Sequence, residues 1–250
     1  MDKQLFTYTL RLADDGLILG HRLSEMCSKG PILEEDLALT NIALDYIGRS
    51  QALLDYAAKI EGQGKDADHY AYRRPENEYF NHLLTEQPNT DFAWVIARQF
   101  FFSAYEFYFY KELENSKDTE LAAIASKTVK EVKYHLEHAA DWMVRLGDGT
   151  EESHQRLFAA VKHLYMFTGE LFEMDSVDMD LVKKGIAVDK EKVKVQWQKC
   201  VEKVVLEATL SLPNSAFMQT GSRAGVHSEH LGHLLSEMQY LQRAYPDAKW

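Results

Sequence analysis

Residues 118–147, DTELAAIASKTVKEVKYHLEHAADWMVRLG, decide the fold class of this chain. Apolar or small side chains recur in this stretch every three or four residues, which is the period of an amphipathic helix. The recurring positions are Leu121, Ala125, Thr128, Val132, Leu136, Ala139, Met143 and Leu146. Asp118 can cap the start and Gly147 can end the helix, so the stretch predicts a helix of about eight turns.

The same period predicts further helices along most of the chain. We expect them at 3–27, 34–60, 76–86, 91–115, 151–172, 189–211 and 223–244. Four of the five prolines fall between such segments, and no alternating strand pattern competes. The stretch 61–75 is the most loop-like, and 173–188 is also irregular.

Two of these segments are too apolar to lie on a surface. Residues 37–60 carry apolar side chains on nearly every face, and ten of the nineteen residues in 92–110 are aromatic. Such helices have to be surrounded by others. The sequence therefore predicts an all-α chain folded as one domain over 1–250, with an antiparallel four-helix bundle at about 3–146 and additional helices at about 150–245.

The net charge of -11 repels phosphate backbones and anionic lipid headgroups, which argues against nucleic acid and anionic membrane surfaces as partners. Only Cys27 and Cys200 are present, so neither a disulfide framework nor a CxxC metal knuckle is expected. The N-terminal stretch has acids where a signal peptide needs apolar residues, and no run of eighteen apolar residues occurs. We expect a cytoplasmic protein that is neither exported nor membrane-spanning.

Several charged or ionisable residues lie inside these apolar segments, where an unpaired charge costs several kcal/mol. They are Asp14, Asp45, Arg49, Glu106, Glu131 and His135. One acid on each of four helices is the pattern of a dinuclear carboxylate bundle, in which two helices each give one Glu and the other two each give a Glu-x-x-His pair. Four carboxylates and two imidazoles suit two iron ions.

This ligand set is damaged. Residues 45–49 read Asp-Tyr-Ile-Gly-Arg instead of Glu-x-x-His. After Glu131, Tyr134 takes the third position and His135 comes one residue late. Arginine keeps its proton in proteins, so Arg49 is a fixed cation beside the place of the metal. The sequence argues against a working metal site.

Structural interpretations compete with the functional ones. Asp45 and Arg49, one turn apart, can form an intrahelical salt bridge. Glu106 can pair with an arginine or a tyrosine hydroxyl of a neighbouring helix. The one intact Glu-x-x-His, from Glu151 to His154, follows Thr150 and is interpreted as a helix cap.

The C-terminal stretch 227–242, HSEHLGHLLSEMQYLQ, is rich in histidine. Steps of three residues turn by −60°, so His227, His230 and His233 spread over about 120°, too far for a single ion. We predict a docking helix instead, with an apolar stripe of Leu231, Leu234, Leu235, Met238 and Leu241. The candidate docking residues are His230, His233, Glu237, Met238 and Tyr240.

At its C-terminus, HSEHLGHLLSEMQYLQRAYPDAKW, the chain closely resembles the C-subunit family of the bacterial ring-1,2-phenylacetyl-CoA epoxidases. The resemblance continues through DLALTNIALDYIGRSQALLDYA, LLTEQPNTDFAWVIARQFF, KEVKYHLEHAADWMVRLGDGT and EATLSLP, and so covers essentially the whole length. It implies a ferritin-like fold in a structural subunit that has lost its metal ligands. The lost positions would be Tyr46, or Asp45 one residue earlier, together with Arg49 and Tyr134.

The resemblance also implies the partners. A catalytic A subunit of related fold would carry the di-iron centre and epoxidise phenylacetyl-CoA, and a separate reductase would act on the complex. This chain itself would bind no cofactor, and it would form a homodimer or a hetero-oligomer.

Two other functions stay open at this point. The first is a di-metal oxidase or oxygenase in its own right, built on Asp14, Asp45, Glu106, Glu131 and His135, which Arg49 opposes. The second is a contribution to a coenzyme A pocket, for which the basic pairs at 73–74 and 183–184 are the candidates, although such pairs are more often solvated loop charges.

Overall fold

The structure is a computed structural model that describes residues 1–214, 217–246 and 248. All regular elements in these residues are helices, which confirms the all-α, ferritin-like prediction. The long helices are α1 (Lys3–Ser24), α2 (Leu33–Glu61), α5 (Phe92–Leu113) and α6 (Thr119–Gly147). The other elements are α3 (Ala67–Tyr72), η1 (Glu76–Glu78), α4 (Leu83–Glu86), α7 (Glu151–Leu164), η2 (Tyr165–Phe167), η3 (Gly169–Phe172), α8 (Ser176–Lys184), α9 (Lys190–Glu207), η4 (Ser222–Ala224), α10 (Glu229–Met238) and α11 (Tyr240–Ala244).

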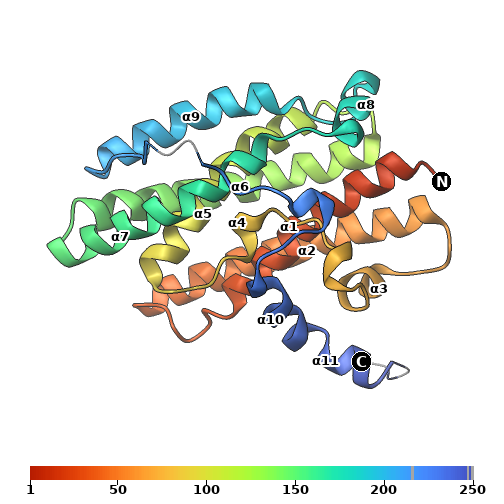
Figure 1. Cartoon of the computed structure of the whole chain (residues 1–250), viewed down its shortest axis with the longest axis horizontal. Coiled ribbons are helices and arrows are strands. Elements are labelled where there is room, and N and C mark those ends of the chain that lie inside the picture. Colours follow the sequence, from red (N-terminus) through yellow and green to blue (C-terminus); the bar gives the residue numbers. More distant parts are fainter. Residues whose placement is uncertain (215–216, 247, 249–250) are drawn as a thin grey trace.

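The long helices pair as two hairpins, α1 with α2 and α5 with α6, and these are the most extensive helix contacts in the described chain (Figure 1). The remaining helices pack around this bundle, with α7 and α9 against α5 and α8 against α1. None of the described helices is both long and apolar enough to cross a bilayer.

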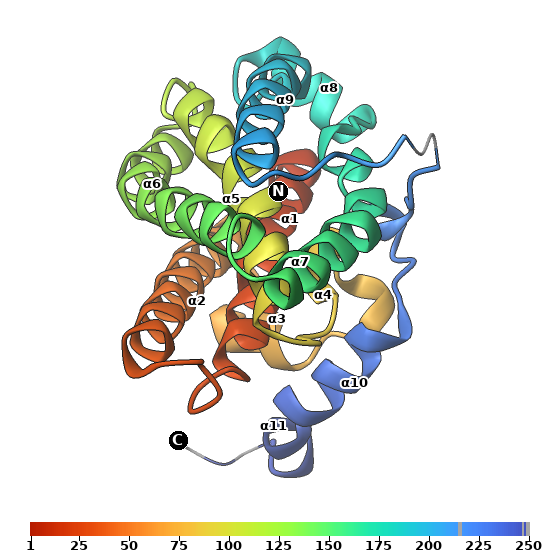
Figure 2. The same cartoon turned by 90° about the vertical axis from the view of Figure 1, so that its left-hand side faces the viewer.

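α5 runs through the middle of the molecule, as its aromatic composition predicted (Figure 2). Phe100, Phe101 and Phe102 are wholly buried. The Phe101 ring packs against Trp197 of α9, and the Phe102 ring against His82, which precedes α4. The indole of Trp197 on α9 donates a hydrogen bond to the carbonyl oxygen of Phe101 at 2.9 Å. Each buried phenyl ring is worth about 1.5–3 kcal/mol relative to an exposed one, so this aromatic layer supplies much of the core.

α2 is not surrounded, and here the prediction from the sequence was wrong. One face of α2 packs closely on α1, where a Cβ added at Gly20 would come within 2.9 Å of the Ile47 side chain. The opposite face leaves Leu33, Leu37 and Leu44 exposed by 70%, 54% and 63%. The later helices pack against α5 and α1, so nothing in the described chain covers this side of α2.

The prediction of a single helix at 76–86 was also wrong. Carboxylates from other helices accept hydrogen bonds from the backbone N–H groups of this segment. Residues between η1 and α4 are extended. Asp14 accepts from the Phe80 N–H at 3.0 Å, and Asp15 accepts from the His82 N–H at 2.7 Å. Glu170 accepts from the Leu83 N–H at 3.0 Å. These bonds replace those that a continuous helix would have made.

Several other boundaries differ from the prediction. The stretches 61–75 and 173–188 contain the short helices α3 and α8, which the sequence analysis missed. The helix expected at 223–244 begins only at Glu229, and the one expected at 151–172 becomes 3₁₀ after Leu164. The bounds of α6 agree closely: Asp118 caps it by accepting from the Leu121 N–H at 2.9 Å, and Gly147 ends it.

Candidate functional site

The centre of the four-helix bundle holds a buried ion pair. Glu106 on α5 and Arg49 on α2 are 2% and 4% exposed, and the Arg49 guanidinium donates to Glu106 Oε1. The other carboxylate oxygen accepts from the Tyr46 hydroxyl at 2.8 Å. The pairing of Glu106 with an arginine and a tyrosine of a neighbouring helix is therefore confirmed.

Polar and aromatic neighbours complete this cluster. Gln99 donates to the Tyr46 hydroxyl at 2.9 Å and to Ser103 Oγ at 2.8 Å. The Arg49 guanidinium lies 4.8 Å from the ring centres of both Tyr46 and Tyr110. The sequence analysis missed Gln99 and Ser103, although their spacing of seven and three residues before Glu106 places all three on one face of an otherwise apolar helix.

The ionisation of the cluster follows from its burial. Burial raises the pKa of Glu106 to about 7, against the opposing effect of Arg49. Burial and the neighbouring carboxylate raise the pKa of Tyr46 well above its usual value, so its hydroxyl stays protonated and donates. Burial alone would lower the pKa of Arg49, but the Glu106 carboxylate raises it. In this buried site, the Glu106 carboxylate and the Arg49 guanidinium each stabilise the charged form of the other.

Asp45 and His135 form a separate pair, which corrects the predicted salt bridge between Asp45 and Arg49. His135 Nε2 lies 3.0 Å from Asp45 Oδ2, whereas Arg49 turns inward to α5. The two α2 positions differ by about 40° around the axis, enough to send one side chain toward α6 and the other toward α5. Burial lowers the pKa of His135, and its Nδ1 has no hydrogen-bond partner.

The remaining candidate ligands lie elsewhere. Glu131 lies 3.5 Å from Lys127 on the flank of α6, and Tyr134 is 48% exposed. Asp14 binds Arg74, which holds the 67–80 segment against α1. Of the eight predicted positions, Tyr46, Arg49 and Glu106 share the centre, and the Asp45–His135 pair lies beside it, with the His135 ring 5.1 Å from the Tyr46 ring. The other three positions lie apart from the centre.

A dinuclear carboxylate centre does not fit these residues. Both oxygens of Glu106 are already bonded, and one of the bonding groups is a permanent cation that would repel a metal ion. Within residues 1–214, 217–246 and 248, no three His, Cys, Asp or Glu side chains are grouped so that they could hold a metal. That this chain binds no metal stays a prediction.

A second buried cluster, the Glu86 anchor, fastens the C-terminal part of the chain. Glu86 is fully buried and accepts from the Ser228 N–H at 2.7 Å, from Asn81 Nδ2 at 2.9 Å and from His227 Nδ1 at 2.9 Å. The other ring nitrogen of His227 donates to the Tyr79 carbonyl oxygen at 2.8 Å. Both ring nitrogens face acceptors, which favours the doubly protonated, cationic form of the imidazole and raises the pKa of His227.

The three C-terminal histidines have different surroundings, in agreement with their predicted spread. His227 precedes α10 and lies in the Glu86 anchor. The backbone oxygen of His230 accepts from Arg22 at 2.9 Å, and His233 is exposed. The Glu151–His154 pair follows a Thr150 cap that accepts from the Ser153 N–H, so it is a helix start as predicted.

The basic pairs offer little to a coenzyme A phosphate. Arg74 is buried and bound to Asp14, which corrects its interpretation as a solvated loop charge. Arg73 donates to the Pro246 carbonyl oxygen. Lys183 and Lys184 are exposed and lie 3.4 Å from Asp180 and 3.7 Å from Asp2.

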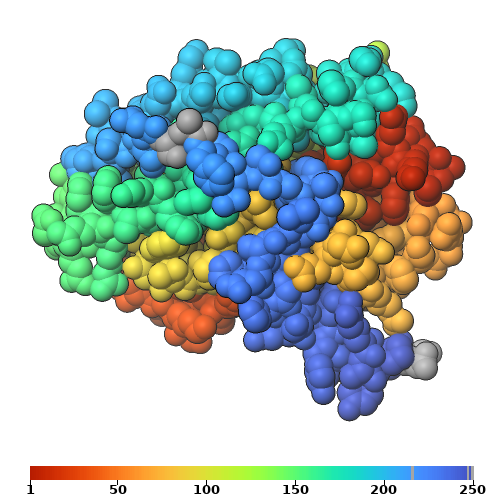
Figure 3. All heavy atoms as spheres, in the orientation of Figure 1, coloured from red at the N-terminus to blue at the C-terminus, as the bar shows by residue number. Residues whose placement is uncertain are grey.

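The C-terminal arm (residues 229–244, α10 and α11) projects from the body of the molecule (Figure 3). Its leucines 231, 234 and 235 are buried against this chain, so most of the predicted apolar stripe is not free for a partner. Among the candidate docking residues, His233, Glu237 and Tyr240 are exposed, while His230 and Met238 are half-buried.

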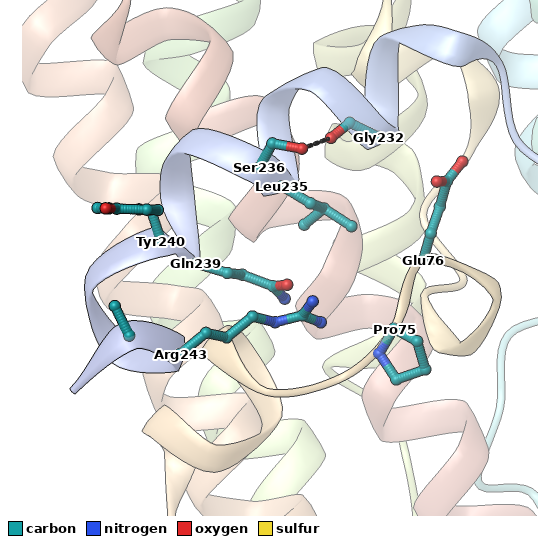
Figure 4. A pocket seen from close by; sticks show the side chains of 9 residues that line it. Pro75, Glu76, Gly232, Leu235, Ser236, Gln239, Tyr240 and Arg243 are labelled. Atoms are coloured by element: carbon teal, nitrogen blue, oxygen red, sulfur yellow. Dashed lines mark hydrogen bonds between the residues drawn. The ribbon is translucent and has the colours of Figure 1, made fainter. Parts of the chain in front are cut away.

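A pocket of about 630 Å³ separates the arm from the segment at Pro75 and Glu76. Leu235 and Arg243 point across it toward Glu76, and Ser236 donates to the Gly232 carbonyl oxygen at 2.8 Å beside it (Figure 4). The pocket carries one acid and one base at its two sides, beside the exposed ring of Tyr240.

Two comparisons with known proteins agree on what this chain is similar to. A family model described as phenylacetic acid catabolic protein matches residues 1–250. The C subunit of the 1,2-phenylacetyl-CoA epoxidase of Escherichia coli (strain K12) is 46% identical over 247 residues, which is 99% of each chain. The similarity therefore includes both the bundle and nearly all of the C-terminal part.

Proposed function

The chain belongs to the phenylacetic acid catabolic protein family, and on this basis we propose that it is a non-catalytic structural subunit of a phenylacetyl-CoA epoxidase. It holds and orients a separate catalytic subunit in the aerobic degradation of phenylacetate. That partner carries the di-iron centre, and a reductase supplies electrons to the complex.

One observation carries the proposal. Where a dinuclear carboxylate centre would need open carboxylates, Glu106 is bonded through both oxygens to Tyr46 and Arg49. The centre of the bundle is thus occupied by a structural ion pair. This speaks against the alternative of a di-metal oxidase in its own right, since such an enzyme has to admit two cations and oxygen at this place.

The C-terminal arm supplies a surface for the catalytic subunit. Tyr240 and Leu241 are exposed by 64% and 46% at its end, and Tyr245, which follows the arm, is exposed by 59%. Exposed aromatic side chains next to a pocket are typical anchors of protein–protein interfaces. The arm is fixed to the body by Gln239, which donates to the Arg74 carbonyl oxygen at 3.0 Å and to the Tyr79 hydroxyl at 2.8 Å.

Co-purification tests both the proposed scaffold role and the proposed interface at the C-terminal arm. We expect the wild-type chain, co-expressed with a tagged catalytic subunit of such an epoxidase, to be retained with it in fixed ratio. Tyr240→Asp should weaken the complex by about tenfold or more, because it places a charge in an aromatic anchor position.

Phe158→Asp on α7, where the ring is 42% exposed, is the matched control and should leave retention unchanged. Wild-type chain that is not retained by the catalytic subunit would contradict the scaffold. Equal retention of both variants would show that the arm is not part of the interface with the catalytic subunit.

A further inference from the structure

A cavity of about 270 Å³ lies between the N-terminal half of α1, the C-terminal end of α2 and the segment that contains α3. Four of its lining residues belong to α1: Lys3, Phe6, Thr7 and Leu10. They fall within about 100° of arc around the helix axis, and so form one face of α1. The axial rise places Lys3 and Leu10 about 10 Å apart along the helix, and α1 lines the cavity over this length.

The walls of the cavity are largely aromatic. The rings of Phe6 and Tyr70 meet edge to face, with centroids 5.8 Å apart. Phe80 is half-buried and Leu10 is buried on the same lining. An apolar cavity of about 150 Å³ is large enough to take up benzene. This cavity therefore has room for one aromatic ring and a short polar group, and its walls favour a ring through edge-to-face or offset contacts.

Three donor side chains of the lining are free. The Lys3 ammonium, the Thr7 hydroxyl and the His69 ring make no hydrogen bond or ion pair with the described part of the chain. Lys3 and Thr7 are one turn apart on α1, so they can reach the same group. Burial, together with the charges of Lys65 and Arg73, lowers the pKa of His69, so its ring is neutral at pH 7 and offers one N–H. A carboxylate can accept from all three donors, and Lys3 matches its charge.

The acids of the lining leave these donors open. Glu61 accepts from the Lys65 ammonium at 3.1 Å and from the Tyr70 hydroxyl at 2.6 Å. Glu78 lies toward the other end of the cavity, because its carbonyl oxygen accepts from Arg74, which is bound to the middle of α1. The end at the first turn of α1 is therefore the one that suits an anion.

We propose that this cavity binds a small aromatic carboxylate, with its ring between Phe6, Tyr70 and Phe80 and its carboxylate at Lys3 and Thr7. The ring fills the aromatic part, and the carboxylate satisfies the free donors. Phenylacetate, a ring that carries its carboxylate on one methylene, is short enough to lie between the levels of Lys3 and Leu10. The proposal does not rest on the proposed function, because it uses only the residues that line the cavity.

Calorimetric titration of the full chain with phenylacetate tests the site. We expect a dissociation constant on the order of 0.1–1 mM, as for a ligand of about ten non-hydrogen atoms. Lys3→Gln should weaken binding by about tenfold, because it removes the cation, and Thr7→Trp should abolish binding, because it fills the cavity. Phenylacetamide, which lacks the charge, and hexanoate, which lacks the ring, should each bind at least about tenfold more weakly.

Lys203→Gln on α9, where the lysine side chain is 73% exposed, is the matched control and should bind phenylacetate like the wild-type chain. Circular dichroism should confirm that the variants keep their helices. Since Lys3 is exposed, Lys3→Gln tests the site even where Thr7→Trp fails to fold. The proposal is overturned by the absence of binding at about 10 mM phenylacetate, by wild-type affinity in Lys3→Gln, or by equal affinity for phenylacetamide. Equal affinity for hexanoate would also overturn it, because the walls would then not select an aromatic ring.

Discussion

Replacement of Arg49 by methionine is expected to lower the free energy of unfolding by about 3–5 kcal/mol, because it removes one partner of a buried ion pair. The substitution leaves the Glu106 carboxylate buried without its cation, with only the Tyr46 hydroxyl as a partner. Urea unfolding followed by circular dichroism measures the loss.

The double variant Arg49→Met with Glu106→Gln is the control. It removes both charges while the glutamine can still accept from Tyr46, so it should regain a large part of the lost stability. The loss in the single variant should be smaller in mildly acidic buffer, because burial raises the pKa of Glu106 to about 7 and the protonated acid needs no cation. A loss below about 1 kcal/mol would show that the pair is not essential to the bundle.

The second large effect is expected at the Glu86 anchor. Glu86→Gln should free the segment 222–244, at a cost of about 3–5 kcal/mol, because the buried His227 cation loses its carboxylate and two further donors compete for one amide oxygen. Hydrogen exchange should show lost protection in this segment while α5 and α6 stay protected.

The anchor also predicts a pH dependence. Burial alone would lower the pKa of His227, but its bonds to Glu86 and Tyr79 raise it above 6.5. A histidine whose pKa is raised on folding stabilises the folded state fully at pH values below its pKa in the unfolded chain. This stabilisation is lost as pH rises through the folded-state pKa. Protection of the arm against hydrogen exchange, corrected for the intrinsic exchange rate, should therefore fall over this pH range. In Glu86→Gln this step should vanish, whereas Glu237→Gln on the exposed face of α10 should keep it. Unchanged hydrogen-exchange protection of the segment 222–244 in Glu86→Gln would show that the Glu86 anchor does not hold this segment.

The long helices were predictable because their information is local. The period of α6 and its capping Asp118 lie within the segment itself, and the structure agrees within a residue. The 76–86 segment was mispredicted because its backbone bonds come from Asp14, Asp15 and Glu170, far away in the chain. No periodicity inside the segment carries that information.

The site divides in the same way. The spacing of residues 45–49 and 131–135 predicts an incomplete ligand set, which stays a prediction. The apolar context of Glu106 correctly required a partner from another helix. The partner of Arg49 depends on the direction in which its side chain leaves the α2 axis. The sequence spacing favoured Asp45, one turn away on the same helix, whereas the structure directs Arg49 toward Glu106 on α5. The Glu86 anchor joins residues that are about 140 positions apart, so only the fold could reveal it.

The metal content of the chain is the most direct test of the claim that its bundle is held by an ion pair instead of a metal centre. The chain would be expressed alone in medium supplemented with iron and manganese, purified without chelator and analysed by elemental mass spectrometry. We predict far less than one metal ion per chain in a fully helical protein. About two ions per chain, the loading of a dinuclear carboxylate centre, would contradict the account and make this subunit an oxidase candidate.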